Sequence, residues 1–274
     1  MKKKYRLKSN IKKIFYHVIY TITILIACFL IFLIIKNLYG KKKIKQSENV
    51  INNIVDIKEI IDKGELINEP EDKEDLYWKF INYNLIDVNL DELKAINSDT
   101  VGWIQVNNTN INSPIVKYSD NEYYLNHQFD KKANGAGWIY MDYRNNRDVM
   151  NNKNTIIYGH SLKNKALFGS LLQTVNDNWH TNIDNLIIKT VNENNSYLWQ
   201  IFSVYTIKDN NDYIQTEFND DTEYEEFLNI IHTRSKYDLN TRVNINDRII
   251  TLSTCYSSDG SIKLVIHAKM IKKN

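Results

Sequence analysis

The segment Ile249-Ile250-Thr251-Leu252-Ser253-Thr254-Cys255 decides how this chain folds and what chemistry it can perform. It is an apolar, β-branched run that ends on a cysteine, which is typical of a buried strand. A second such run, Asn154-Thr155-Ile156-Ile157-Tyr158-Gly159-His160, ends on a histidine. Two strands that end side by side would hold a thiol against an imidazole, the minimum machinery for acyl transfer through a thioester. The sequence therefore predicts that Cys255 is a nucleophile and that His160 is its base.

Alternating apolar and polar residues recur beyond these two segments and predict about eight short strands separated by Asn- and Asp-rich turns. So many short strands favour a barrel that is closed or nearly closed. Helical patterns lie before the barrel and, over residues 222–235, within it. Thr222 is the expected N-cap of that inserted helix, with Glu225 three residues later. We therefore expect an α+β fold, an eight-stranded β-barrel with N-terminal helices and a helical insertion.

Apolar residues run almost unbroken from Ile14 to Ile35, with no charged residue among them. A helix of about 20 residues spans a bilayer, and this run is apolar on every side, unlike a core helix. A cleaved signal peptide is the alternative. Its apolar region is shorter, roughly 7–15 residues, and ends at a small-residue cleavage site that this sequence lacks. The sequence predicts an uncleaved transmembrane anchor over residues 14–36.

The flanks of the apolar run set its orientation. Residues 1–13 contain seven basic residues and no acidic one, against five basic residues between 36 and 45. Positively charged flanks stay in the cytoplasm. We expect a single-pass protein of the cell membrane with a cytoplasmic basic tail (1–13), the anchor (14–36), a stalk with N-terminal helices (37–85) and an extracellular catalytic domain (86–274).

Charge divides unevenly along the chain. Residues 1–45 hold 12 of the 35 basic residues and none of the 33 acidic ones, so residues 46–274 carry a net charge of −10. Because no basic surface is expected outside the juxtamembrane segment, nucleic acid is not an expected partner. The juxtamembrane lysines are instead expected to contact the headgroups of membrane lipids.

Cysteine usage points to the same residue as the strand pattern. Cys28 falls inside the apolar run, so Cys255 is the only thiol in the expected exported part and cannot form an intramolecular disulfide there. Such a lone cysteine is reactive, forms an intermolecular bridge, or is buried and inert, and the count alone does not choose among these. Neither Cys-x-x-Cys nor His-x-x-x-His spacing is present, so we expect no metal. We also expect no cofactor.

A thioester mechanism needs fixed donors or a positive charge for the oxyanion. No arginine follows Arg248, so Lys263, at the start of the last predicted strand, is the local candidate. His267 falls on the same face of that strand and is the serious rival of His160 for the role of base.

These residues resemble the sortases, cysteine transpeptidases of Gram-positive cell surfaces. Thr251-Leu252-Ser253-Thr254-Cys255 matches their Thr-Leu-x-Thr-Cys signature, and Tyr158-Gly159-His160 matches the segment that carries their catalytic histidine. The N-terminal helices and the helical insertion look like those of class B. Ser253 and Thr254, next to the nucleophile, are candidate substrate-binding residues. Further similarity lies in Gly102-Trp103-Ile104, Asp120-Asn121-Glu122-Tyr123-Tyr124-Leu125 and Met141-Asp142-Tyr143-Arg144-Asn145.

One position departs from the family pattern. Sortases carry an arginine in the last strand that contacts the substrate carbonyl, whereas this chain has Lys263 there, in Lys263-Leu264-Val265-Ile266-His267-Ala268-Lys269. Lysine supplies a positive charge but cannot donate the bidentate hydrogen bonds of an arginine guanidinium. Either Lys263 acts as a weaker clamp, or a distant arginine folds in, or the activity is low. The sequence leaves these three alternatives open.

The resemblance implies that Cys255 cleaves the backbone after a threonine in a C-terminal sorting signal and that an amine resolves the thioester. The implied partners are surface proteins bearing that signal, and a peptidoglycan precursor or a pilin as the amine acceptor. Two alternatives remain. One is a cell-wall cysteine peptidase, in which water resolves the thioester, and the other is an anchored binding module with a degenerate site.

Overall fold

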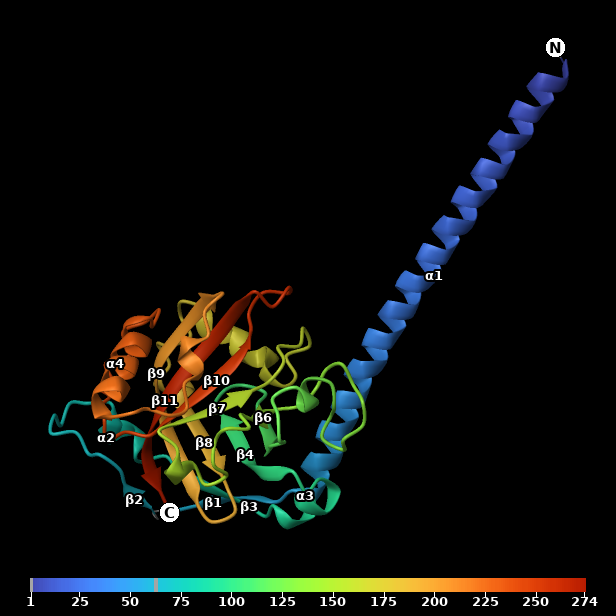
Figure 1. Ribbon diagram of the computed structural model, residues 1–274. Helices are drawn as coiled ribbons and strands as arrows, with labels where there is room; N and C mark the ends of the chain where they lie inside the picture. The colour runs from blue at the N-terminus through green and yellow to red at the C-terminus, as the bar shows by residue number, and fades with distance from the viewer. Residues whose placement is uncertain (1, 62–63) are drawn as a thin grey trace. The chain divides into compact units, whose positions relative to one another are not determined.

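The computed structural model describes residues 2–61 and 64–274, which form two units, one ending at Lys43 and a compact one from Ile44 to Asn274. Helix α1 (Lys2–Ile54) begins in the first unit and ends in the second (Figure 1). Its apolar side chains from Ile14 to Ile35 are exposed. It is the one helix in the described part of the chain that is long and apolar enough to cross a membrane.

The last turns of α1 belong to the compact unit. Ile44 and Ile51 lie two helical turns apart on one face and are buried in its hydrophobic core. Strand β1 (Ile57–Ile60) then pairs antiparallel with β3 (Leu85–Val88), so packing begins well before residue 86. The sequence predicted a stalk with helices over residues 37–85, because Ile57 and Ile60 stand at helical spacing, and the structure has a strand there instead. The expected domain boundary at residue 86 stays a prediction.

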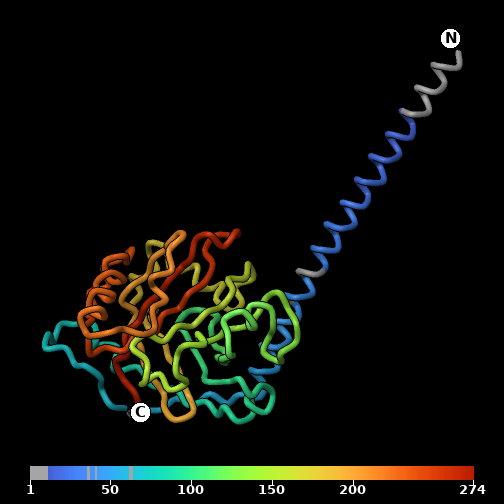
Figure 2. The backbone as a smooth tube through the Cα atoms, viewed as in Figure 1, coloured from blue at the N-terminus to red at the C-terminus, as the bar shows by residue number. Residues whose placement is uncertain are grey.

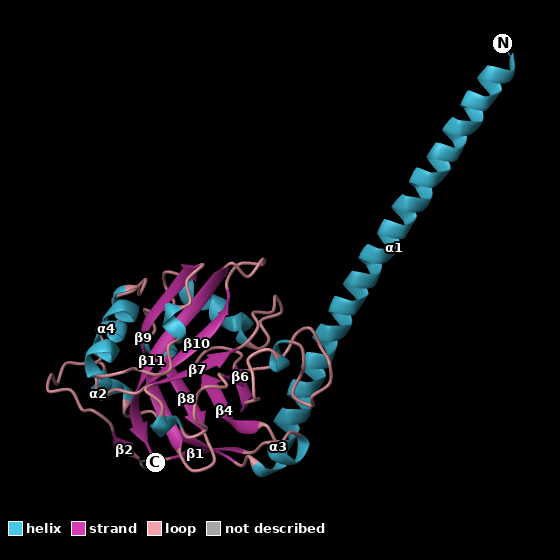
Figure 3. Cartoon of the chain, viewed as in Figure 1, coloured by secondary structure: helices cyan, strands magenta, loops and turns pink. Residues whose placement is uncertain are grey.

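Eight strands form a closed barrel, which confirms the fold expected from the sequence (Figure 3). They follow the order β10-β7-β6-β5-β4-β8-β9-β11, and the pairing of β10 with β11 closes the ring, while the short β2 adds to the far end of β11. The strands are β2 (Glu65–Leu66), β4 (Thr100–Val106), β5 (Asn112–Val116), β6 (Tyr140–Met141), β7 (Asn154–Tyr158), β8 (Ile187–Val191), β9 (Ser196–Lys208), β10 (Ile249–Cys255) and β11 (Ile262–Lys273).

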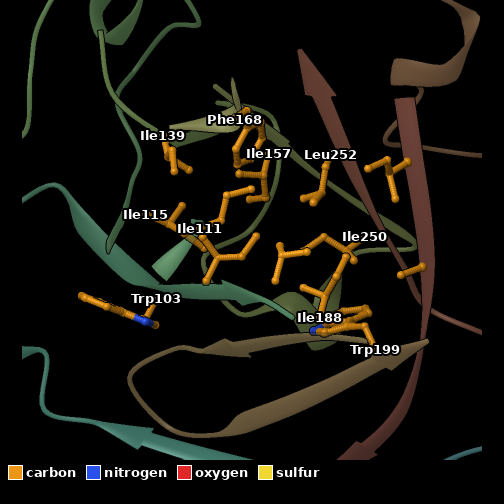
Figure 4. Close-up of a cluster of buried hydrophobic side chains, with 14 of the residues drawn as sticks. Trp103, Ile111, Ile115, Ile139, Ile157, Phe168, Ile188, Trp199, Ile250 and Leu252 are labelled. Carbon is orange, nitrogen blue, oxygen red and sulfur yellow. The ribbon is translucent and has the colours of Figure 1, made fainter. Parts of the chain in front are cut away.

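Side chains of β10 enter two hydrophobic clusters in alternation. Ile250 and Leu252 join the main core, which Figure 4 shows together with Trp199 from β9. Ile249 joins a second cluster with Tyr224, Phe227, Leu228 and Ile231 of helix α4. Because successive side chains of a strand point to opposite faces, a strand covered on both faces needs an unbroken apolar run. Double burial accounts for the apolar Ile249, Ile250 and Leu252. Thr251 and Ser253, which share a face with Ile249, are buried with hydrogen-bond partners.

Helix α4 (Asp221–Thr233) is the inserted helix, and its cap differs from the one expected. Asp220, not Thr222, is the N-cap, and its carboxylate accepts the N–H of Glu223 at 2.9 Å. The Glu223 carboxylate accepts the N–H of Asn219, the residue before the N-cap, at 2.6 Å. The arrangement resembles a capping box and lies two residues earlier than predicted. The other helices are α2 (Tyr77–Phe80), α3 (Asp91–Ile96), and the 3₁₀ turns η1 (Tyr123–Leu125), η2 (Val149–Asn151), η3 (Phe168–Val175), η4 (Ile183–Leu186) and η5 (Asp212–Ile214).

Candidate active site

Strand β10 brings the two signature segments together. It pairs in parallel with β7, with Ser253 opposite Tyr158, and the backbone trace in Figure 2 shows these distant segments side by side. Parallel strands end at the same rim, so His160 and Cys255 leave the barrel at one place. Two hydrogen bonds from side chains join the strand ends: Thr254 Oγ1 donates to the carbonyl of Gly159 at 2.6 Å, and Ser161 Oγ donates to the carbonyl of Cys255.

A cleft of about 290 Å³ opens at this rim. It contains all three residues that the sequence predicted to be catalytic, Cys255, His160 and Lys263, each of which is partly exposed. The predicted substrate-binding residues Ser253 and Thr254 also lie in its wall. The remaining lining residues are Asn121, Leu125, Tyr140, Tyr158, Gly159, Asn211, Tyr213 and Ile214.

Lys263 contacts the thiol directly. It is the partner of Cys255 in the antiparallel β10–β11 ladder, and its Nζ donates to the Sγ of Cys255 at 3.2 Å. A cation at this distance stabilises negative charge on the sulfur or on an oxygen bound beside it, and hydrogen bonds with an ionised partner are about twice as strong as neutral ones. The cleft therefore has a thiol with an ammonium group beside it.

The imidazole of His160 is held in one tautomer. Its Nε2 lies 3.0 Å from the carbonyl oxygen of Leu125, which can only accept, so Nε2 carries the hydrogen. In that tautomer Nδ1 has no hydrogen and can accept a proton. Gly137 makes room for the ring, because a Cβ built there would lie 3.0 Å from Cδ2 of His160.

His267 lies outside the cleft lining and is fully buried. The hydroxyl of Thr251 donates to Asn154 at 2.6 Å and so accepts from Nδ1 of His267 at 2.8 Å, and Nε2 accepts from the hydroxyl of Tyr205 at 3.0 Å. Burial, assisted by the charge of Arg234, lowers the pKa of His267 to about 3. A neutral, fully bonded imidazole of this kind holds strands together, so the geometry favours His160 as the base.

The hydroxyls of Ser253 and Thr254 are both engaged within the protein. Ser253 Oγ lies 3.0 Å from the hydroxyl of Tyr213, and Thr254 Oγ1 binds Gly159. Both residues therefore position cleft walls as well as lining the cleft. Their role in binding substrate stays a prediction.

Sequence reasoning gave no role to several residues that shape the cleft. Tyr213 and Ile214 come from the insertion before α4, and Asn121 comes from the loop before η1. Asn121 binds the buried carboxylate of Asp142 at 2.9 Å, and Asp142 pairs with Arg144 at 2.7 Å. The segment 141–145 had been singled out for its family likeness alone. Within the described residues, no group of three or more His, Cys, Asp or Glu side chains is arranged to hold a metal ion.

Comparison with known proteins agrees with this geometry. The family model "Sortase domain" matches residues 104–271. Sortase B of Listeria monocytogenes is 36% identical over 186 residues, which cover 67% of this chain and 74% of that protein. The chain covers 84% of the Staphylococcus aureus sortase B–substrate complex at 35% identity with a TM-score of 0.61, over 67% of its own length. For a sortase B complexed with triglycine the identity is 34% and the TM-score 0.62, with 67% of this chain and 85% of that chain covered. This chain therefore belongs to the sortase family of cysteine transpeptidases and is a homologue of sortase B.

Proposed function

We propose that this protein is a membrane-anchored transpeptidase that cleaves a C-terminal sorting signal through a thioester on Cys255 and transfers the acyl group to a cell-wall amine. The observation that carries the proposal is the shared cleft of Cys255, His160 and Lys263, with an ammonium nitrogen 3.2 Å from the sulfur. A binding module with a degenerate site would not need a cation beside a partly exposed thiol.

The chemistry follows from the placement of these groups. The sulfur of Cys255 attacks the carbonyl carbon of the substrate, and Lys263 stabilises the oxyanion that forms. Nδ1 of His160 accepts the thiol proton and delivers it to the leaving amine as the C–N bond breaks. An incoming amine then attacks the thioester and gives a proton to His160 as the new C–N bond forms. The C–S bond breaks, and His160 passes that proton to the departing sulfur, which regenerates the thiol of Cys255.

The partners are proposed from the relatives. One sortase B structure is a complex with a substrate, and another is a complex with triglycine. These support surface proteins bearing a sorting signal as acyl donors and a glycine-type amine, such as that of a peptidoglycan precursor, as acceptor. A pilin amine is the alternative acceptor.

We further infer that α1 anchors the enzyme in the cell membrane. The exposed apolar side chains between Ile14 and Ile35 support an anchor over residues 14–36. The basic residues of 1–13 then stay in the cytoplasm, and the catalytic domain is extracellular. A cleaved signal peptide would separate the helix from the domain, so the intact mass of the protein purified from membranes distinguishes the two.

The test uses the full chain in detergent micelles with a peptide library, in the presence and absence of triglycine. Mass spectrometry should detect library peptides cleaved after a threonine and joined to triglycine. Hydrolysis alone at saturating triglycine would indicate a peptidase, and no cleavage of any peptide would indicate a binding module. The Cys255→Ala variant is the matched control for background cleavage.

A further inference from the structure

We propose that Asp142 is a positioning residue of this enzyme, whose single buried carboxylate fixes three walls of the cleft around Cys255. The inference rests on the proposed function, because it concerns how the cleft presents a peptide to the nucleophile. It assigns a role to the segment 141–145, which family likeness had marked without explaining.

Five donors converge on Asp142, whose side chain has no exposed surface. The N–H and Nε of Arg144 donate to Oδ1, both at 2.9 Å, and Nη2 of Arg144 donates to Oδ2 at 2.7 Å. Nδ2 of Asn121 and the hydroxyl of Tyr158 also donate to Oδ2, both at 2.9 Å. A carboxylate offers about four lone-pair sites, so these donors use its full capacity.

Each side chain that donates to Asp142 either lines the cleft or binds a residue that lines it. Asn121 and Tyr158 line the cleft themselves, and Tyr158 precedes His160 by two residues. Arg144 reaches the third wall, because its Nη2 also donates to the carbonyl of Ile214 at 2.9 Å. The carboxylate thus links the loop before η1, the end of β7 and the insertion before α4.

The charge of Asp142 is needed for this arrangement. Burial alone would raise the pKa of the carboxyl, but the hydrogen bonds from Arg144, Asn121 and Tyr158 outweigh burial and hold the pKa below its usual value. The group is therefore ionised at neutral pH, and an ionised acceptor binds its donors about twice as strongly as a neutral one. An amide of the same shape would turn an NH₂ group toward donors, leaving part of the network unpaired.

The third wall is also held from its other side. Ser253 contacts the hydroxyl of Tyr213 at 3.0 Å, and Nδ2 of Asn154 donates to the carbonyl of Gln215 at 2.8 Å. Loss of the Arg144 arm should therefore shift Ile214 without releasing the whole segment or unfolding the barrel. Because the expected change is confined to Ile214 and its neighbours, an effect on the cleft can be distinguished from an effect on the stability of the whole domain.

The experiment compares Asp142→Asn and Arg144→Lys with wild type in the full chain, using the best library peptide and triglycine. Arg144→Lys keeps the positive charge. A lysine cannot donate two hydrogen bonds to the carboxylate of Asp142 and at the same time donate to the carbonyl of Ile214. We expect its KM for the peptide to rise about tenfold with kcat little changed. Asp142→Asn releases all three walls, so kcat/KM should fall roughly a hundredfold, the usual scale for misplacement by about 1 Å. Rates are expressed per folded enzyme, with the folded fraction of each variant measured by circular dichroism, so that unfolded protein does not count as lost activity.

The matched control is Arg248→Lys, because Nε of Arg248 also donates to a carbonyl, that of Met150 at 2.6 Å, but outside the cleft. Its kinetics should equal those of wild type. A second readout needs no activity: amide hydrogen exchange over residues 211–215 should accelerate in Arg144→Lys and not in Arg248→Lys. A kcat/KM per folded enzyme equal to that of wild type in Asp142→Asn, or unchanged hydrogen exchange in Arg144→Lys, would overturn the inference. A wild-type enzyme that cleaves no peptide would instead overturn the proposed function, while the exchange rates would still decide the role of Asp142.

Discussion

Lys263 and Cys255 are directly opposed in the β10–β11 ladder, and the Nζ of the lysine lies 3.2 Å from the Sγ of the cysteine. Opposed residues project their side chains on the same face of a sheet, so the lysine stem runs beside the nucleophile. Of the three alternatives that the sequence left open, this geometry supports a lysine that takes the place of the family's arginine. Its contribution to the reaction is a prediction, and substitution tests it.

Lys263→Ala should lower kcat by on the order of a hundredfold or more, the usual cost of losing an oxyanion donor. KM for the peptide should change less, because the contact strengthens in the transition state. Lys263→Arg should restore the activity that is lost in Lys263→Ala, or raise it above that of wild type. The guanidinium supplies the paired N–H donors that the resemblance to sortases implies. Steady-state transfer of peptide to triglycine measures all three, and wild-type turnover in Lys263→Ala would assign the positive charge elsewhere.

Cys255→Ala should abolish turnover and leave the fold intact. The thiol is partly exposed, so its removal creates no buried cavity. Peptide cleavage followed by mass spectrometry measures the loss, and circular dichroism melting checks the fold. Residual cleavage above the no-enzyme background would rule out the thioester mechanism.

His160→Ala should lose nearly all activity, since general acid–base catalysis contributes typically 10²–10⁴-fold. His267→Ala should lower activity only through weaker packing between β10, β11 and β9. Both variants are assayed per folded enzyme, with the folded fraction measured by circular dichroism, so that folding losses in His267→Ala do not count as catalytic losses. If the two outcomes were reversed, the base would be His267.

His267 should also make the stability of the protein depend on pH. The folded-state pKa of His267 is about 3, against an ordinary value of 6.5, because burial disfavours the charged ring. The unfolded chain therefore binds a proton below pH 6.5 that the folded chain does not, and the stabilisation is lost as pH falls from 6.5 toward 3. The loss is on the order of 4 kcal/mol. Urea unfolding of wild type and His267→Gln should show a smaller decrease in the variant between pH 7 and pH 4, and equal decreases would contradict this.

Strand patterns in the sequence were sufficient to predict the barrel and the strand ends that meet at the cleft. The apolar runs before Cys255 and His160 can be recognised from neighbouring residues alone. In β10 the run is pronounced because both faces of the strand are buried. The 13 residues of β9 form one strand, which pairs with β8 along one part and with β11 along most of its length. The two-residue β2 is too short to show a period.

The network around Asp142 could not be predicted, for a different physical reason. Arg144 and Ile214 lie 70 residues apart, and their contact is a hydrogen bond to a main-chain carbonyl, which any residue type could supply. Asp142 and Arg144 also occur in a short polar segment that reads as an ordinary turn. The N-cap of α4 was misplaced because Asp220, Asp221 and Thr222 are all good caps, and packing of the apolar face decides among them.

The closure of the barrel by β10 has a consequence for when the enzyme can become reactive. The histidine end of β7 and the cysteine end of β10 are about 95 residues apart in the chain. At synthesis rates of roughly 5–20 residues per second, the first end emerges several seconds before the second. Long-range pairing of this kind also folds slowly. A chain that is still being synthesised therefore lacks the complete cleft, which forms only once the last two strands have joined the barrel.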